Sequence, residues 1–446
     1  MENKIVEIRV NELFGFLNHR VALKEDGVTF IHGPNGCGKT TFLKLIACFF
    51  EWDISSLNEI NFNSLEIVYD NNKEISVEKS IKKEEINDEN IEIPILSFLL
   101  KENGETVENF EYQRNIKDIK IHASEIDDYI PFLKQVGPRK WVDIRSAERF
   151  SYHEVIERYE HRLPFSSTKK RPEWLSSLQE EAKLHFVQTQ RLLKVTYEHN
   201  RHRGEEQNVS NVIELYSKEI SEKISNLMAE SAEVSQSKDR SFPQRLLSLK
   251  LDAALPEEII RKNYKDTENK IEKLMDSGLI QQEKNLSLPG QQFEATEKKV
   301  LSLYLEDINE KLSVFDDLLT RVEIFLNIVS HKLRNKTFKV RQKDGFLIET
   351  TQGKKQELKP NQLSAGEQHE IVLFYELIFK TSDNSFFLID EPEISLHIDW
   401  QRQFLSDISK IASLGKHSFL VATHSPQIIG NRRDLAVSLD GGILND

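Results

Sequence analysis

A glycine-rich octapeptide between a strand-like and a helix-like segment constrains this chain most. Residues 33–40 read Gly-Pro-Asn-Gly-Cys-Gly-Lys-Thr and fit the pattern G-x-x-x-x-G-K-[ST]. The apolar run Val28–His32 before it predicts a strand and Thr40–Phe50 after it predicts a helix, which is the context this pattern requires. Glycines let successive backbone N–H groups surround a phosphate, and the helix N-terminus adds partial positive charge. The predicted phosphate-binding residues are Gly33, Pro34, Asn35, Gly36, Cys37, Gly38, Lys39, Thr40 and Thr41.

Two side chains of this loop are expected to act on the bound phosphates. Lys39 would span the β- and γ-phosphates and take part in catalysis, and the Thr40 hydroxyl would ligate Mg²⁺. A chance match is the alternative, and the correctly placed strand and helix argue against it. We therefore predict ATP and Mg²⁺ as cofactors.

A late apolar run ends in the carboxylates that such an enzyme needs. Residues 386–391 read Phe-Phe-Leu-Ile-Asp-Glu, so that Asp390 would hold the Mg²⁺ shell and Glu391 would polarise the attacking water. The alternative is a buried strand that ends at a solvated acidic turn. Glu393 is either a group that supports these acids or an acid at a helix N-terminus beside Pro392, and the sequence leaves both open.

Residues 363–368, Leu-Ser-Ala-Gly-Glu-Gln, precede a helical run and resemble the Leu-Ser-Gly-Gly-Gln-like signature of the ABC-type ATPases. Ser364, Gly366 and Glu367 would form a second anion site with the N-terminus of the following helix. In the ABC class this site closes over the γ-phosphate bound to the other protomer. Ala365 departs from the commonest spelling. A capping box with Ser364 at the N-cap and Glu367 at N3 is a compatible interpretation.

The resemblance assigns three further positions. His424, in the run Val421–Ser425, stands where the ABC class has its switch histidine, which contacts the γ-phosphate. Ser395-Leu396-His397 occupies the position of the D-loop. Gln188, directly after the strand-like run 185–187, resembles the Q-loop glutamine that completes the Mg²⁺ shell, with Gln190 as the alternative.

Hydrophobic periodicity predicts an α/β fold into which a mainly helical segment is inserted. Short strands are expected around the octapeptide, with an antiparallel flap over residues 65–100, and a hairpin is expected around Lys343-Asp344-Gly345. From about residue 201, apolar residues recur with a period of 3.5, typical of a coiled coil or bundle. Two polar stretches, 229–245 and 277–292, are predicted to be loops. Long helices are expected there, and the clearest one carries the heptad positions Leu301, Leu305, Ile308, Leu312, Phe315, Leu319, Val322, Leu326 and Val329. Shorter strips lie at Ile260, Tyr264, Thr267, Ile271 and Leu274 and at Ile213, Tyr216, Ile220 and Leu227.

These elements fit an ABC-type P-loop ATPase head with a mixed sheet lobe and a short, coiled-coil-like helical insertion. We expect the N-terminal part of the head at residues 1–200, the insertion at 201–335 and the C-terminal part at 336–446. A length of 446 residues agrees with two or three folding units.

Composition excludes several classes of protein. The net charge of −13 excludes a chain-wide basic coat for nucleic acid, although a local patch stays open. No apolar run approaches a membrane span, and the N-terminus has no apolar signal core, so a soluble, cytoplasmic protein is expected. Cys37 and Cys48 are the only cysteines, and the intervening helix would keep them beyond disulfide reach.

The motif set points to one branch of the ABC class. Lys39 and Asp390 are too far apart for a transporter domain, and the insertion is much shorter than the arms of SMC-like and DNA-end-repair ATPases. The chain ends soon after His424, where overcoming-lysogenization-defect nucleases continue into a TOPRIM domain, so no attached nuclease is expected. The remaining resemblance is to stand-alone ATPase subunits of two-gene anti-phage systems, first the AriA-type ATPases of PARIS and then the PtuA-type ATPases of Septu.

That resemblance implies an ATPase scaffold that controls a separate TOPRIM nuclease, AriB-like, in response to a phage-encoded trigger protein. A DNA-clamping ATPase of repair or recombination is the alternative. A composite site needs two copies, so a homo-oligomer of head pairs is expected, and apolar strips on the insertion would allow a larger ring such as a hexamer. Packing of the strips within one chain is the simpler interpretation.

A basic stretch stands out in this acidic chain. It would suit DNA or an acidic trigger protein, whereas alternating Lys and Arg on an exposed strand is also ordinary edge protection. Its cations are Lys332, Arg334, Lys336, Lys339, Arg341 and Lys343.

Overall fold

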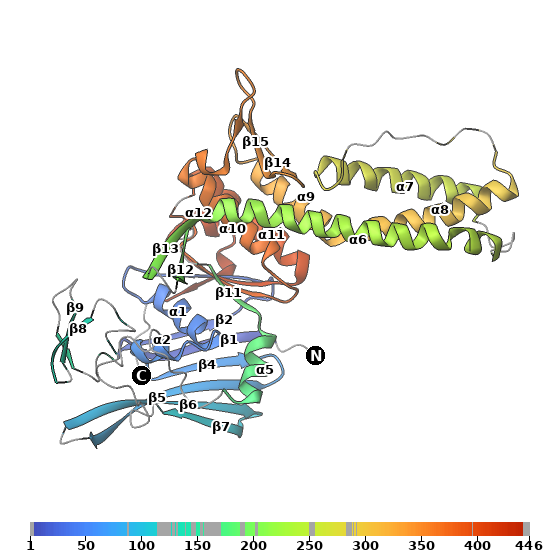
Figure 1. Cartoon of the computed structure of the whole chain (residues 1–446). Coiled ribbons are helices and arrows are strands. Elements are labelled where there is room, and N and C mark those ends of the chain that lie inside the picture. Colours follow the sequence, from blue (N-terminus) through green and yellow to red (C-terminus); the bar gives the residue numbers. More distant parts are fainter. Residues whose placement is uncertain are drawn as a thin grey trace. The chain divides into compact units, whose positions relative to one another are not determined.

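The chain forms two compact units in the computed structural model, one of residues 1–23, 35–182 and 439–446, the other of residues 24–34 and 183–438. Figure 1 labels many of their helices and strands. The described residues are 4–86, 89–113, 126, 130, 133–138, 140–143, 149–151, 155, 171–187, 192–200, 204–248, 255–281, 288, 290, 292–394 and 396–439.

The first unit is built on an antiparallel sheet with strand order β2-β1-β4-β5-β6-β7. The predicted antiparallel flap is confirmed, since β4, β5 and β6 pair in succession. Helix α1 packs onto this sheet through aromatic side chains, with the ring of Phe49 6.4 Å from that of Phe98, and the ring of Trp52, just beyond α1, lies 5.2 Å from Phe98. The strands are β1 (Ile5–Leu13), β2 (Leu17–Ala22), β4 (Ser64–Tyr69), β5 (Lys73–Ile86), β6 (Glu89–Glu102) and β7 (Glu105–Gln113), and the helices are α1 (Lys39–Phe50), α2 (Ile54–Glu59) and α5 (Glu173–Glu181). A separate three-stranded sheet contains β8 (Leu133–Gly137), β9 (Lys140–Asp143) and β10 (Arg149–Ser151).

A five-stranded parallel sheet forms the centre of the second unit, with strand order β11-β17-β18-β3-β19. Its middle strands are continuous apolar runs because both faces are covered, as is usual for parallel sheets. Nearly every residue of β17 and β18 is buried. The strands are β11 (Leu184–Val187), β17 (Phe386–Asp390), β18 (Ser418–Ala422), β3 (Val28–His32) and β19 (Ala436–Ser438), and the helices are α10 (Ala365–Phe379), α11 (Ile398–Gly415) and α12 (Pro426–Ile429).

Helices α6 to α9 form the predicted helical insertion in the second unit. Helix α8 contacts both α6 and α7, and the three run side by side in Figure 1. The predicted apolar strips are buried or half-buried against one another and against the core. The α/β fold with a helical insertion is therefore confirmed. The helices are α6 (Val212–Ser248), α7 (Glu257–Asp276), α8 (Ala295–Ser313) and α9 (Asp316–Ser330).

Two predictions about the insertion are wrong. Residues 229–245 are helical, because α6 continues through Pro243 to Ser248. Their polarity is used in contacts with α8, where Arg245 binds Asp307 through two bonds of 2.6 and 2.7 Å. The heptad run at 301–329 is not one helix either, since it breaks at Val314 and Phe315 between α8 and α9.

A predicted hairpin is confirmed at β14 (Lys336–Arg341) and β15 (Gly345–Thr350). Its turn rests on α6, where the Ser217 hydroxyl donates to the carbonyl of Asp344 at 3.2 Å and accepts from the Phe346 N–H at 2.8 Å. The remaining elements of the second unit are β12 (Leu193–Asn200), β13 (Gly204–Asn211), β16 (Glu357–Leu358) and the short 3-10 helices η5 (Pro360–Gln362) and η6 (Arg433–Leu435).

The division of the chain at residues 200 and 335 stays a prediction, and α6 to α9 lie between these positions. Across the described ranges, no helix combines the length and the apolar character that a membrane span requires. Both cysteines are free thiols, as expected, and both are buried.

Candidate functional site

Three neighbouring parallel strands bring separate motifs to one edge of the sheet. Asp390 at the end of β17 is aligned with Ala422 at the end of β18, which is aligned with Ile31 of β3. Because carboxyl ends of parallel strands meet at the same edge, the acidic turn, the histidine turn and the start of the glycine-rich loop leave the sheet together. The Thr423 N–H donates to the Ile31 carbonyl at 3.1 Å, which joins two of these exits directly.

The rest of the glycine-rich loop lies in the first unit and requires its glycines. Gly36 and Gly38 have φ of 87° and 85°, in the left-handed region that side chains disfavour. A Cβ on Gly38 would also lie 2.9 Å from Leu13 Cδ2. Gly38 is the N-cap of α1 and offers no side chain to cap the first turn, so the N–H groups there suit an anion.

Hairpin β1–β2 supports this loop from within the first unit. The His19 Nε2 lies 2.8 Å from the carbonyl oxygen of Cys37, and burial lowers the pKa of His19 against the opposing effect of that hydrogen bond. Lys39 is buried, and its Nζ lies 3.7 Å from Cys37 Sγ. No sequence pattern singles out His19, because its partner is a backbone atom.

The acidic turn after β17 carries an unusual backbone. Glu391 has φ of 43°, and its N–H donates to the Ala422 carbonyl at 2.9 Å. Its carboxylate faces the histidine turn, with Oε1 3.6 Å from Nε2 of His424, and both side chains are partly exposed. The left-handed conformation costs a non-glycine residue free energy, so this orientation is enforced by the turn. Asp390 is buried beside it.

Glu393 has a role that the sequence left open. Its Oε2 accepts from the Thr423 hydroxyl at 2.9 Å and its Oε1 accepts from the His424 N–H at 2.6 Å. The N-cap of the following helix, α11, is His397, which accepts from the N–H of Asp399. Glu393 therefore does not cap α11, and support of the acids Asp390 and Glu391 stays a prediction.

The signature-like segment starts α10 as a capping box. The Ser364 hydroxyl accepts from the Glu367 N–H at 3.4 Å, and Glu367 Oε2 accepts from the Ser364 N–H at 3.0 Å. Glu367 Oε1 also binds Lys336 Nζ at 2.7 Å. Burial raises the pKa of Glu367, but Lys336 and Ser364 outweigh it and hold that pKa below its usual value. The capping-box interpretation is confirmed, and contact of Ser364, Gly366 or Glu367 with a nucleotide stays a prediction.

Three predicted positions lie outside the described residues: Gln188, Gln190 and Ser395. Strand β11 ends at Val187, one residue before Gln188.

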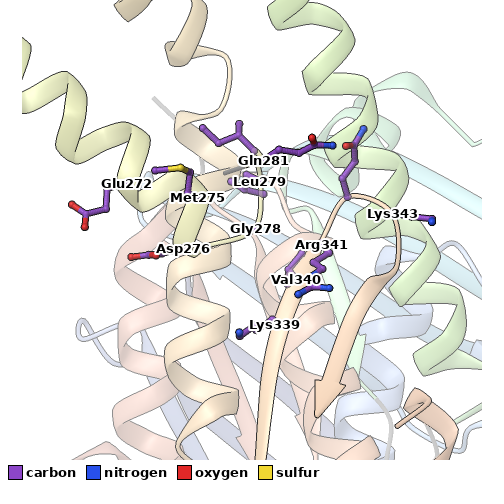
Figure 2. A pocket seen from close by; sticks show the side chains of 12 residues that line it. Glu272, Met275, Asp276, Gly278, Leu279, Gln281, Lys339, Val340, Arg341 and Lys343 are labelled. Atoms are coloured by element: carbon purple, nitrogen blue, oxygen red, sulfur yellow. The ribbon is translucent and has the colours of Figure 1, made fainter. Parts of the chain in front are cut away.

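The basic stretch divides into two sets. Lys332 is buried with Glu370 at 2.5 Å and Asp407 at 2.8 Å, while Arg334 pairs with Asp399 and Lys336 pairs with Glu367. The remaining set lines a cleft of about 770 Å³ next to β14, opposite acidic side chains of α7, as Figure 2 shows. Its cations are Lys339, Arg341 and Lys343, and the acids are Glu272 and Asp276.

Each unit by itself contains oxygen donors of a kind that would suit a magnesium nucleotide. Thr40 supplies a hydroxyl oxygen at the first turn of α1, and Asp390 supplies a carboxylate at the sheet edge. Mg²⁺ prefers such oxygen ligands and commonly completes its shell with phosphate oxygens and water. The left-handed glycines and the glycine N-cap would provide a cradle for phosphate.

Comparisons with known proteins agree with this chemistry. The family described as the AAA ATPase domain matches residues 4–429. No curated protein matches the chain.

Three similar solved structures are remote in sequence. The Smc head domain of Pyrococcus furiosus, with an extended coiled coil and bound to the C-terminal domain of ScpA, is 13% identical with a TM-score of 0.37, covering 96% of this chain and 92% of that one. An Smc head bound to the C-winged helix domain of ScpA is 12% identical with a TM-score of 0.34, covering 96% and 91%. The SMC head domain of Thermotoga maritima is 12% identical with a TM-score of 0.30, covering 97% and 92%. By the match over nearly its whole length, the chain belongs to the AAA ATPase domain family.

Proposed function

We propose that this protein binds ATP with Mg²⁺ and hydrolyses it slowly at a site completed by a second copy of the chain. One observation carries the proposal: Glu391 and His424 face each other at 3.6 Å, at the sheet edge where β3 leads into the glycine-rich loop. A carboxylate that faces a histidine, at the sheet edge from which a phosphate-binding loop begins, suits activation of water for phosphoryl transfer.

Each residue has a distinct task in this proposal. The N–H groups of the glycine-rich loop and Lys39 hold the phosphates, and Thr40 and Asp390 hold the metal. Bound Mg²⁺ would neutralise charge on the phosphate oxygens. Glu391 accepts a proton from the attacking water, and His424 donates a hydrogen bond toward the terminal phosphate.

Ser364 would act on the nucleotide of another copy. The capping box fixes the N-terminus of α10, and the ABC-like spelling of residues 363–368 suggests that this helix end approaches a terminal phosphate across a subunit boundary. A homo-oligomer of head pairs, alone or joined in a larger ring such as a hexamer, follows from this arrangement.

The biological role we propose is that of an ATPase scaffold in anti-phage defence, related to the AriA-type subunits of PARIS. It would control a separate, TOPRIM-type nuclease and respond to a phage-encoded trigger protein. The support is the resemblance of the motif runs at residues 33–41, 390–397 and 423–427.

A second candidate function is DNA clamping in repair or recombination. The observation that favours it is the row formed by Lys339, Arg341 and Lys343, none of which forms an ion pair with another residue that the structure describes. This candidate predicts ATP turnover stimulated by DNA and binding that weakens steeply with salt. Lys339→Glu with Arg341→Glu would then abolish the stimulation without changing basal turnover.

The test of the leading proposal combines nucleotide binding with phosphate release. Lys39→Ala should abolish ATP binding, because the loop loses its only cation directed at the phosphates. Glu391→Gln should bind ATP as the wild type does and lower turnover about 100-fold or more, because the amide is not a base. Normal ATP binding by Lys39→Ala would refute the site assignment.

A further inference from the structure

One carboxylate joins the two turns that carry Glu391 and His424. Glu393 belongs to the turn after β17, yet both of its oxygens accept hydrogen bonds from the turn after β18. The partners are the Thr423 hydroxyl at 2.9 Å and the His424 backbone N–H at 2.6 Å. Hydrogen bonds to a charged acceptor are the strong ones, so this is a firm link between segments 30 residues apart.

The Thr423 hydroxyl extends this link into the histidine turn. It is fully buried, and while its hydroxyl donates to Glu393, the same oxygen accepts from the Ser425 N–H at 3.0 Å. The hydroxyl therefore continues the chain of hydrogen bonds from the carboxylate into the histidine turn. A relay of this kind fixes the backbone on both sides of His424.

A second tie holds the same turn from α11. The Ser425 hydroxyl donates to the Gln401 side-chain oxygen at 2.6 Å, and the Gln401 amide donates to the Leu396 carbonyl at 3.1 Å. Residues 423–425 are thus hydrogen-bonded to the acidic turn on one side and to the start of α11 on the other.

The consequence concerns the distance between Glu391 and His424. At 3.6 Å their side chains do not form a hydrogen bond of ordinary length, so they do not hold each other in place. Their separation is set instead by the two backbones from which they extend. The Glu391 N–H joins these backbones before Thr423, at the Ala422 carbonyl, and the Glu393 side chain joins them at Thr423 and His424.

We propose that Glu393 is a positioning residue: by holding Thr423 and the His424 N–H, it sets the place of His424 opposite Glu391 and so controls turnover but not nucleotide binding. The inference rests on the proposed function, which it deepens. Each Glu393 oxygen already accepts a bond from the histidine turn, so the carboxylate is committed to the protein and not to a nucleotide.

Steady-state kinetics and nucleotide binding test the first part. Glu393→Ala should lower kcat about 10- to 100-fold, the usual cost of losing a supporting partner, with the Kd for ATP unchanged within about threefold. Thr423→Val keeps the shape but loses the hydroxyl, and should also lower kcat. Thr423→Ser restores the hydroxyl and should recover most of the activity. Wild-type kcat in Glu393→Ala, or loss of ATP binding, would overturn the assignment.

A double-mutant cycle tests whether Glu393 acts through His424. In a His424→Ala background, Glu393→Ala should cause no further loss, because there is no histidine left to position. Multiplication of the two single losses would overturn the inference. Glu357→Ala, an exposed acid on β16, serves as the matched control and should match the wild type throughout.

A readout that needs no turnover separates this inference from the proposed function. If the wild type releases no phosphate, the proposed function fails, and the ring resonances of His424 still report its position. Glu393→Ala and Thr423→Val should shift them, whereas Thr423→Ser and Glu357→Ala should not. Unmoved resonances in Glu393→Ala would overturn the positioning role whatever the ATPase result.

Discussion

The structure gives Lys332 a different role from the one that its place in a basic stretch suggests. In the sequence it belongs to a basic stretch, but its ammonium is only 3% exposed and lies between the carboxylates of Glu370 and Asp407. It also lies over the ring of Phe374, 4.4 Å from the centroid. One buried cation thus joins the end of α9 to α10 and α11.

The two acids around one cation predict a pH dependence of stability. Burial raises the pKa of Glu370 from 4.5 to about 7, with Lys332 acting against the shift and Asp407 adding to it. Between pH 4.5 and about pH 7, Glu370 holds a proton in the folded chain that it releases in the unfolded chain. The contribution of Glu370 to the free energy of unfolding therefore falls as the pH rises through this range. Glu370→Gln should therefore gain stability relative to the wild type between pH 4.5 and pH 7, by at most about 3 kcal/mol.

Urea unfolding of both proteins across this pH range measures that difference. The exposed acid Glu357 supplies the control, because Glu357→Gln should parallel the wild type. A constant difference between Glu370→Gln and the wild type would show that Glu370 is already ionised in the folded state at pH 5.

The roles of single residues were only partly predictable. The phosphate loop, the acidic turn and His424 stand out because their spacing is specific. The partners of Lys332 and Glu393 lie far away in the chain, and the pairing depends on which helices and turns the fold brings together. No local pattern contains that information.

At the scale of elements, a glycine allows hairpin β14–β15 to pack closely against α6. Gly345 has φ of 68°, and a Cβ there would lie 1.8 Å from the backbone oxygen of Ser217. Gly353 has a similar φ of 73°, yet no atom lies within 4 Å of its Cβ position. The two glycines therefore separate the cost of the backbone conformation from the cost of close packing.

Alanine at each position should have different effects. Gly353→Ala should cost about 1 kcal/mol, because only the left-handed conformation is penalised. Gly345→Ala should cost about 3 kcal/mol or more, because a backbone oxygen of α6 cannot move out of the way cheaply. Thermal unfolding of the two variants provides the measurement. Equal losses would mean that the hairpin can lift from α6 at little cost.

The insertion shows where periodicity is informative and where it fails. The three apolar strips are buried as predicted, because a period of 3.5 requires a partner surface. The polar stretch at 229–245 is helical even so, since serine, glutamate and lysine are tolerated in helices and their contacts with α8 are hydrogen bonds and ion pairs. The break between α8 and α9 at Phe315 could not be predicted from the sequence, because the apolar spacing continues through it.

At the scale of the whole molecule, the proposed composite site makes a prediction about mixtures. Lys39→Ala loses its own phosphate loop, and Ser364→Arg would block the site of its neighbour, so each variant alone should be inactive. In a mixed pair one of the two sites is intact. Mixing equal amounts should restore about a quarter of wild-type turnover, because about half of the pairs are mixed.

Phosphate release from the two variants, separately and together, measures this. The control is each variant alone at the total protein concentration of the mixture, and it should show no recovery of turnover. No recovery in the mixture, with both variants folded, would argue for a site contained within one chain.

Much of the molecular plan followed from the sequence. The α/β class and the helical insertion were accessible, because each depends on a local pattern. The five-stranded order of the parallel sheet was not, because β3 and β11 come from distant parts of the chain and pair through backbone atoms.

The root of α6 and the helix that begins at Ser364 share one junction. Tyr216 stacks on Tyr375 with ring centres 4.4 Å apart, its hydroxyl donates to Glu376 at 2.6 Å, and Lys380 pairs with Glu219. Trimming the insertion from its far end would leave these contacts whole, but removing it at the base would strip one side of α10. The reach of these helices can therefore change without disturbing α10, provided that the contacts at the base of α6 are kept.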